Sequence, residues 1–185
     1  MQERAQPHQN AFEIHIRLKT IEAMFNSLDP SPLVERDLDD TVEDYVVDCV
    51  RDAPHDAPLD LVLHLPGETV SRINGREVGL SVAHYFSFLR DRQSRRIRRL
   101  LREGRQAALV GLLFLAGCTL GAQAVKSIYG GAMGALLGEG LLIIGWVANW
   151  RPVSIFLYDW RPMHQQMRIY DRLAGLNVDL RQDRQ

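Results

Sequence analysis

The sequence predicts an α+β protein in which a two-helix transmembrane hairpin carries a small cytoplasmic domain of about three strands and two to three helices. Two apolar runs within residues 107–150 flank a link at residues 126–129, and each has about the ~20 residues that a helix needs to cross a bilayer. Residues 12–19 and 59–65 alternate apolar with polar side chains, which indicates strands. Residues 38–53 place apolar side chains at helical intervals.

Charge is strongly segregated along the chain, although the net charge is only -1. Residues 1–80 hold 16 acids and 7 bases, residues 81–105 hold 8 arginines and 2 acids, and the link holds a single lysine. Because positive residues collect on the cytoplasmic side of a membrane, we expect both termini in the cytoplasm. Residues 1–10 are polar and no apolar signal-peptide core follows, so the first span is expected to direct insertion.

These patterns divide the chain into five segments, of which the first and the last are expected to form one domain. They are the first part of the cytoplasmic domain (1–80), a basic juxtamembrane helix (81–105), the hairpin (106–150), an interfacial segment (151–162), and a helix and strand that complete the domain (163–185).

Within the domain, the order strand, helix, strand predicts a parallel pair joined by a right-handed crossover. Asp40 and Glu43 have the spacing of a capping box at the start of the first helix. Residues 66–76 fit a short helical turn and a hairpin equally well. From about Glu77 the helical pattern continues without proline into the first span, and residues 177–181 are expected to form a third strand beside residues 12–19.

Small residues recur in both spans at intervals of four. Gly117 and Gly121 form one GxxxG pattern, and Gly130, Gly134 and Gly138 form a doubled one. This spacing lets helix backbones approach closely, so we expect the two spans to pack against each other at these glycines.

Glu139 is the one acid inside the predicted spans, and the fold-back of the hairpin is expected to bring Thr119 and Gln123 to a similar depth. A carboxyl in hydrocarbon costs ~2.5 kcal/mol or more, so it normally faces protein or water or stays protonated. Two interpretations remain open. Glu139 is part of a proton or cation path, or it is a neutral acid hydrogen-bonded to Thr119 or to a neighbouring subunit.

An arginine cluster precedes the first span. Its members are Arg95, Arg96, Arg98, Arg99, Arg102 and Arg105. They fit a topology signal with side chains at lipid headgroups, a specific attraction to anionic lipid, or ion pairs with the acidic helix at residues 38–53. No aromatic side chains are interleaved with them, which argues against nucleic acid as the partner. Trp146, Trp150, Tyr158 and Trp160 mark the same membrane boundary on the returning chain.

Three stretches resemble an uncharacterised family of small two-span bacterial inner-membrane proteins. They are FNSLDPSPLVERDLD, REGRQAALVGLLFL and EGLLIIGWVANWRPVSIFLYDWRP. The resemblance implies a bacterial inner-membrane location and supplies no activity or catalytic residue.

The sequence therefore favours a membrane-tethered scaffold or assembly factor that associates with itself and with an unidentified protein partner. A small ion or proton channel that uses Glu139 is the first alternative. The second is an enzyme on membrane-derived substrates, with candidate groups at Asp29, Asp37, His64 and His84, none of which has partners at a diagnostic spacing. No catalytic, metal or cofactor motif is present, and Cys49 and Cys118 are expected to be free thiols.

Overall fold

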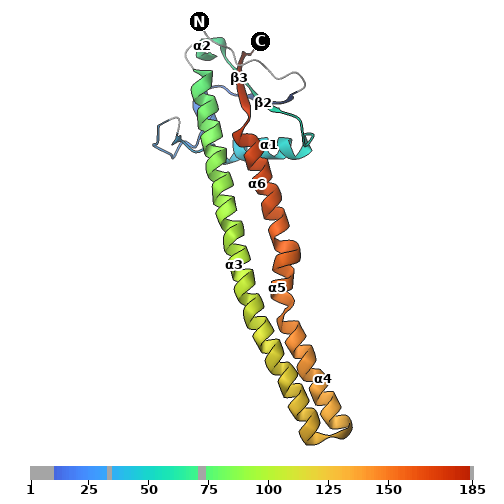
Figure 1. Cartoon of the computed structure of the whole chain (residues 1–185). Coiled ribbons are helices and arrows are strands. Elements are labelled where there is room, and N and C mark those ends of the chain that lie inside the picture. The colour runs from blue at the N-terminus through green and yellow to red at the C-terminus, as the bar shows by residue number, and fades with distance from the viewer. Residues whose placement is uncertain (1–10, 33–34, 71–73, 184–185) are drawn as a thin grey trace. The chain divides into compact units, whose positions relative to one another are not determined.

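The computed structural model describes residues 11–32, 35–70 and 74–183. They group into two compact units, one of Met1–Arg92 with Gln166–Gln185 and one of Gln93–Gln165. The first unit is a mixed α/β domain around a small parallel sheet, and the second consists of helices (Figure 1).

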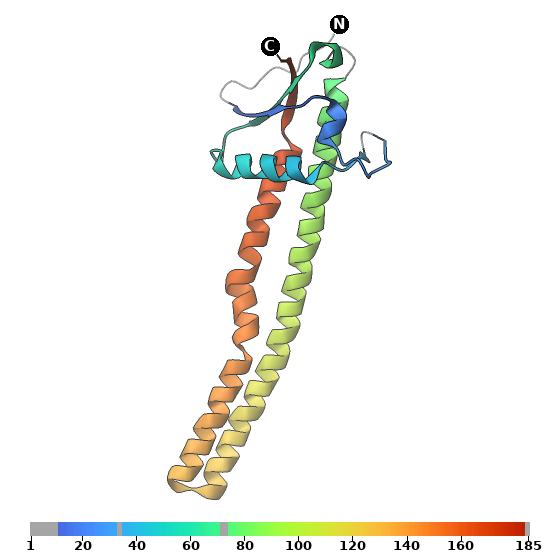
Figure 2. The ribbon, with the colours of Figure 1, turned by 180° about the vertical axis from the view of Figure 1, so that it is seen from behind.

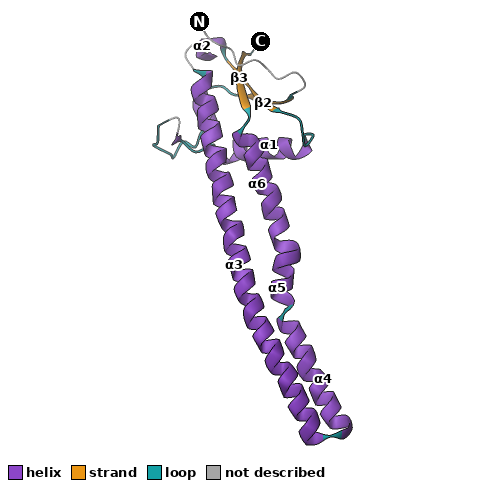
Figure 3. Cartoon of the chain, viewed as in Figure 1, coloured by secondary structure: helices purple, strands orange, loops and turns teal. Residues whose placement is uncertain are grey.

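The sheet has three parallel strands in the order β1-β2-β3. Strand β1 spans Phe12–Arg17, β2 spans Leu59–Leu65 and β3 spans Asn177–Gln182, and Figure 3 colours the strands orange. The parallel pairing of the first two strands was expected, but the third strand lies beside β2 and not beside β1. The reason lies in β2, whose residues are buried on both faces except for the partly exposed His64, as is typical of the central strand of a parallel sheet.

Helix α1, Asp40–Asp52, connects β1 to β2 after a 3-10 turn, η1, at Ile21–Met24. The cap at its start differs from the expected capping box at Asp40. Asp39 is the cap, and its carboxylate accepts the backbone N–H of Thr41. Leu38 forms a β-bridge with Phe25 and is therefore extended. The helix begins two residues later, at Asp40.

The core of the domain lies on one face of the sheet. Val46 and Val50 of α1 and Phe86 and Val82 of helix α3, which spans Gly75–Tyr129, pack there with Leu173. A short helix, α2, occupies Gly67–Val70, so the described part of residues 66–76 contains the helical turn, and residues 71–73 lie outside the described residues. The opposite face of the sheet carries polar and charged side chains, including Glu13, His15, Arg17, His64, Asp179 and Arg181.

The second unit is built from the distal part of α3 and the chain that returns beside it. Helix α3 continues without a break to Tyr129, as predicted, and helix α4, Gly131–Ala148, runs back antiparallel to it in both views (Figures 1 and 2). Gly130 and Gly131 form the turn with φ of 56° and 58°, a left-handed conformation that glycine adopts without strain.

Beyond Asn149 the returning chain remains helical. Helix α5 spans Trp150–Ser154, a π-helical turn, η3, spans Ile155–Asp159, and helix α6 spans Trp160–Ala174. The sequence predicted a separate interfacial segment at residues 151–162 before a helix within residues 163–185. Instead the chain is helical throughout this stretch, and α6 follows the π-helical turn directly at Trp160.

Candidate membrane-spanning hairpin

Two helical stretches are long and apolar enough to cross a membrane, one in α3 and one in the run from Gly131 to Ala174. Only 17% of each apolar stretch is buried, whereas a core helix of a soluble protein is mostly buried. The large apolar side chains that are exposed on them include Leu109, Val110, Leu112, Leu113, Phe114, Leu120, Met133, Leu136, Leu137, Ile143, Ile144, Trp146 and Val147. Exposed apolar side chains in such number are typical of a surface that contacts a membrane or another protein.

Close packing of small residues holds the two helices together along a seam. A Cβ on Gly145 would lie 2.9 Å from Leu115 Cδ1 and 3.0 Å from Cys118 Cβ. A Cβ on Gly138 would lie 3.2 Å from the carbonyl oxygen of Ala122. Both glycines are buried, so the helix backbones approach where a larger residue would not fit.

The seam follows a seven-residue repeat that extends beyond the predicted GxxxG patterns. Gly104, Gly111 and Cys118 are spaced by seven on α3, and all three are buried. On the returning chain Gly138 and Gly145 have the same spacing. A repeat of seven keeps one face of a helix toward its partner, as in coiled coils. Gly104, Gly111 and Gly145 were not predicted as packing residues, although their spacing is visible in the sequence.

The five glycines that the sequence singled out divide into three groups. Gly134 and Gly138 are buried in the seam, and a Cβ on Gly134 would lie 3.5 Å from the backbone of α3. Gly121 lies at its margin, where a Cβ would be 3.3 Å from Leu141. A Cβ on Gly117 or on Gly130 would meet nothing within 4 Å. The hairpin therefore uses Gly134 and Gly138 for its own packing, Gly130 for its turn, and leaves Gly117 facing outward.

Asn149 is a polar link inside the seam, and sequence reasoning missed it. Its backbone N–H donates to the carbonyl of Trp146, so the carbonyl of Gly145 loses its usual helical partner. The Asn149 amide donates to that carbonyl at 3.0 Å and to the carbonyl of Gly111 on α3 at 3.0 Å. The Asn149 side chain thus supplies the hydrogen bond that the Gly145 carbonyl lacks. It also joins the two helices through its hydrogen bond to Gly111. The signal in the sequence was a carboxamide three residues before Pro152.

A second irregularity lies where the returning chain passes Gly104. The turn at Ile155–Asp159 is π-helical, and a Cβ on Gly104 would lie 2.8 Å from Ile155 Cγ2. The Trp160 indole donates to the carbonyl of Phe156 at 2.8 Å, and Arg151 pairs with Asp159 at 3.4 Å. The wider turn lets the chain follow α3 closely while its polar groups stay paired.

Glu139 is exposed on α4, one residue beyond the seam glycine Gly138. The Thr119 hydroxyl donates to the carbonyl of Leu115 on its own helix at 2.8 Å. Gln123 is exposed on α3. Within a single hairpin, the described residues form no hydrogen bond between Glu139 and either of these side chains. The hairpin alone therefore leaves the acid without a protein partner.

All six residues of the predicted arginine cluster are exposed on α3. Arg95, Arg99 and Arg102 lie three, four and seven residues apart, which places them on one helical face. That face points away from the seam, because Gly104 lies half a turn further round the helix. Arg99 pairs with Glu103 of the same helix at 3.0 Å.

In the α/β domain, one carboxylate links three helices. Glu43 of α1 accepts a hydrogen bond from the Tyr85 hydroxyl of α3 at one oxygen and from the Tyr170 hydroxyl of α6, at 3.3 Å, at the other. Burial and the hydrogen bond to Glu43 raise the pKa of Tyr85 well above its ordinary value of 10. The link has a structural explanation, since it fastens α1 to the two long helices.

His64 belongs to a chain of polar contacts on the open face of the sheet. Its Nε2 lies 3.1 Å from Nδ1 of His15, and His15 Nε2 lies 3.2 Å from Glu13. Arg181 of β3 pairs with Glu13 at 2.8 Å and thereby lowers the pKa of that carboxyl. These side-chain contacts connect all three strands of the sheet.

In the described part of the chain, no hydrogen bond or ion pair joins Asp29, Asp37 or His84 to His64. Asp29 closes a loop by accepting the backbone N–H groups of Asp37 and Ser31, and these hydrogen bonds, led by that of Asp37, lower its pKa. His84 is exposed on α3. Among the described residues, no three His, Cys, Asp or Glu side chains lie close enough to hold a metal ion. The four candidates therefore do not form one site.

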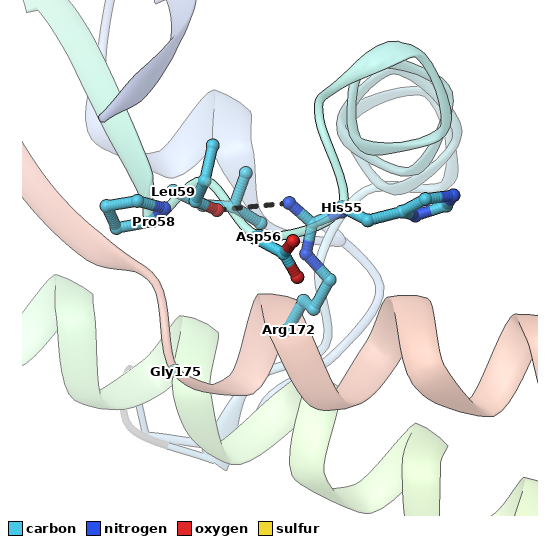
Figure 4. Close-up of a pocket in the computed structure, with 7 residues that line it drawn as sticks. His55, Asp56, Pro58, Leu59, Arg172 and Gly175 are labelled. Atoms are coloured by element: carbon cyan, nitrogen blue, oxygen red, sulfur yellow. Dashed lines mark hydrogen bonds between the residues drawn. The ribbon is translucent and has the colours of Figure 1, made fainter. Parts of the chain in front are cut away.

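An open cavity of about 330 Å³ lies between the loop before β2 and the end of α6 (Figure 4). Arg172 lines it and donates to the carbonyls of Pro54 and Ala57 at 2.8 and 3.1 Å. The His55 ring points away from Arg172 in Figure 4. Because Arg172 is engaged by the backbone, its main role here is to fasten the loop to α6.

The described residues define a mixed α/β protein with a three-stranded parallel sheet and two helices long and apolar enough to span a membrane. Comparison of the chain with protein-family models, curated proteins and solved structures found no match. The resemblance to small bacterial inner-membrane proteins therefore stays a prediction.

Proposed function

We propose that this chain is an integral protein of a bacterial inner membrane that acts as a membrane-tethered scaffold or assembly factor. In this proposal α3 and α4 cross the bilayer as a hairpin, both termini are cytoplasmic, and the α/β domain binds a protein partner. Copies of the chain associate through their membrane segments.

The observation that carries the proposal is the exposure of the hairpin. Its apolar stretches are only 17% buried, and large side chains such as Leu113, Leu120 and Trp146 are more than 60% exposed. In water this surface would drive aggregation, whereas hydrocarbon is a favourable solvent for it. The polar backbone at the helix break is satisfied by Asn149, as a membrane interior requires.

The orientation is supported by charge and aromatic residues. The arginine cluster lies at one end of the hairpin, and the turn at the other end has Lys126 as its nearest base. Arginine-rich flanks stay in the cytoplasm. The exposed face of Arg95, Arg99 and Arg102 adds an attraction to anionic headgroups of about 1 kcal/mol per residue. Trp150 and Tyr158 are exposed at the same end, where aromatic rings favour the headgroup zone.

The scaffold role is tested by purifying the full chain in a mild detergent and measuring the mass of the particle. The proposal predicts a particle that contains more than one copy of the chain or a second protein in fixed ratio. A strict monomer without any bound protein would contradict it.

A small channel or transporter is the second candidate, because Glu139 is exposed on the hairpin and is the one acidic residue of the two apolar runs. If Glu139 lined a water-filled path, its position within a membrane-spanning helix would be explained. Flux of protons or cations into liposomes that contain the purified chain distinguishes the two. A channel loses flux when Glu139→Gln removes the titrating group, whereas equal flux in both proteins eliminates this role.

A further inference from the structure

One side of the hairpin carries its polar side chains. Ala122 and Gly138 face each other across the seam. Gln123 and Glu139 each follow one of these residues, and in an antiparallel pair the same rotation of about 100° turns both toward the same side. Thr119 lies one turn before Gln123 and shares its face. We call this side, with Thr119, Gln123 and Glu139, the polar face.

The polar face brings its residues to one depth. The contacts across the seam put Glu139 level with Gly121, midway between Thr119 and Gln123 along α3. Glu139 is exposed and has no hydrogen bond or ion pair with another described residue. At membrane depth an acid that faces lipid costs about 2.5 kcal/mol or more, so it requires cover by protein.

We propose that the polar face is the interface between two copies of this chain, related by a two-fold axis along the membrane normal. This rests on the proposal that the hairpin spans the membrane. The axis sets α4 of one copy against α3 of the other at equal depth. Glu139 then meets Gln123 and Thr119 of the partner subunit, and the symmetry makes the same contact twice.

The polar face is complementary to itself in its hydrogen-bonding groups. The Gln123 amide can both donate to and accept from a carboxyl group. The Thr119 hydroxyl donates within its own helix, which leaves its oxygen to accept a further hydrogen bond from the partner subunit. Ala135, one turn before Glu139, is small and exposed, so the helices can approach.

The opposite side of the hairpin offers no such pairing. Its outward positions include Gly117, Gly140 and Ile144, which have no polar side-chain atoms, and it suits lipid. The choice of a second copy over lipid as the occupant of the polar face therefore rests on the match of Glu139 with Gln123 and Thr119 at one depth.

Disulfide cross-linking in membrane vesicles tests this interface. Two differently tagged full-length copies are co-expressed, both with Cys49→Ser and Cys118→Ala. One carries Ala116→Cys, two turns before Gln123, and the other carries Ile143→Cys, one turn after Glu139. We expect a cross-linked product of both tags. The matched control pair, Gly117→Cys with Ile144→Cys, lies at the same depth on the opposite side and is expected to give several-fold less product.

Two further variants test whether the cross-linked product depends on Glu139. Glu139→Gln keeps a hydrogen-bonding group and is expected to keep the product, whereas Glu139→Leu is expected to reduce it several-fold while the chain stays in the membrane. Equal or greater product from the control pair, no product from either pair, or no effect of Glu139→Leu would overturn the interface. If the chain leaves the vesicles on alkaline washing, the membrane proposal itself has failed, which separates the two failures.

Discussion

At the scale of single residues, Asn149 is the clearest case of a polar group that is paired among apolar neighbours. Its amide donates to the carbonyl of Gly145, which the helix break leaves without its usual donor, and to the carbonyl of Gly111 on α3. In the domain, Glu43 has a comparable role for the hydroxyls of Tyr85 and Tyr170. Buried polar atoms that lose such partners cost more than the hydrogen bonds contribute.

Asn149→Leu should destabilise the hairpin, because Leu fills the space but leaves the carbonyl of Gly145 without a donor and removes the hydrogen bond to the carbonyl of Gly111 on α3. We expect a loss of about 1–2 kcal/mol, measured as a lower midpoint of thermal unfolding in detergent. Ser127→Ala is the control, since that exposed hydroxyl bonds only within its own helix. An unchanged midpoint for Asn149→Leu would contradict the role of the amide.

Tyr85→Phe should lower the stability of the domain by about 1–2 kcal/mol near pH 8, because it removes a hydrogen bond to a charged group. The pKa of Tyr85 is raised in the folded state, so its contribution is complete below pH 10 and declines as the pH rises above 10 and the unfolded chain ionises. The stability difference between wild type and variant should therefore narrow above pH 10. Chemical unfolding across this range measures it, and a widening difference would contradict the assignment.

At the scale of elements, the small-residue seam determines how α3 and α4 pack. Its glycines differ sharply in the space around them, which makes them a graded set for mutation. A Cβ on Gly145 would clash with Leu115 and Cys118, whereas one on Gly140 would meet nothing within 4 Å. The two sit on the same helix and differ in the face that they occupy.

Gly145→Leu should separate the helices and cost about 1–3 kcal/mol through overpacking. Gly140→Leu, the matched control, should leave the stability unchanged or raise it, because it replaces a glycine in a helix interior. The unfolding midpoints of both variants in detergent are compared with wild type. Similar losses in the two variants would argue against the seam.

The elements with a local pattern could be predicted from the sequence. Strand β2 and the unbroken helix α3 follow from alternation and helical periodicity alone. The strand that pairs with β3 could not be predicted in this way, because it depends on which strand is central in the sheet. The stronger apolar character of β2 was the one indication that β2 is central. In the hairpin, Glu139, Thr119 and Gln123 were recognised by their polarity. Asn149 was missed because its role depends on a helix break that only packing reveals.

At the scale of the whole molecule, charge and apolar surface together predict one topology. A cysteine near the turn, Ser127→Cys, should react with a membrane-impermeant maleimide added to intact cells, because the proposed orientation places the turn outside the cytoplasm. Gln165→Cys, an exposed position of α6, should react only after the cells are broken. Both are placed in chains that carry Cys49→Ser and Cys118→Ala. The reverse pattern would contradict the proposed orientation.

The proposed membrane insertion requires hydrocarbon to be the solvent of α4 and the distal part of α3. The direct measurement is extraction of cell membranes that contain the full chain with alkaline carbonate, followed by detergent. We expect the chain to stay with the membranes in carbonate and to be released only by detergent. Recovery of the chain as a soluble, monodisperse protein in buffer without detergent would contradict the proposed insertion.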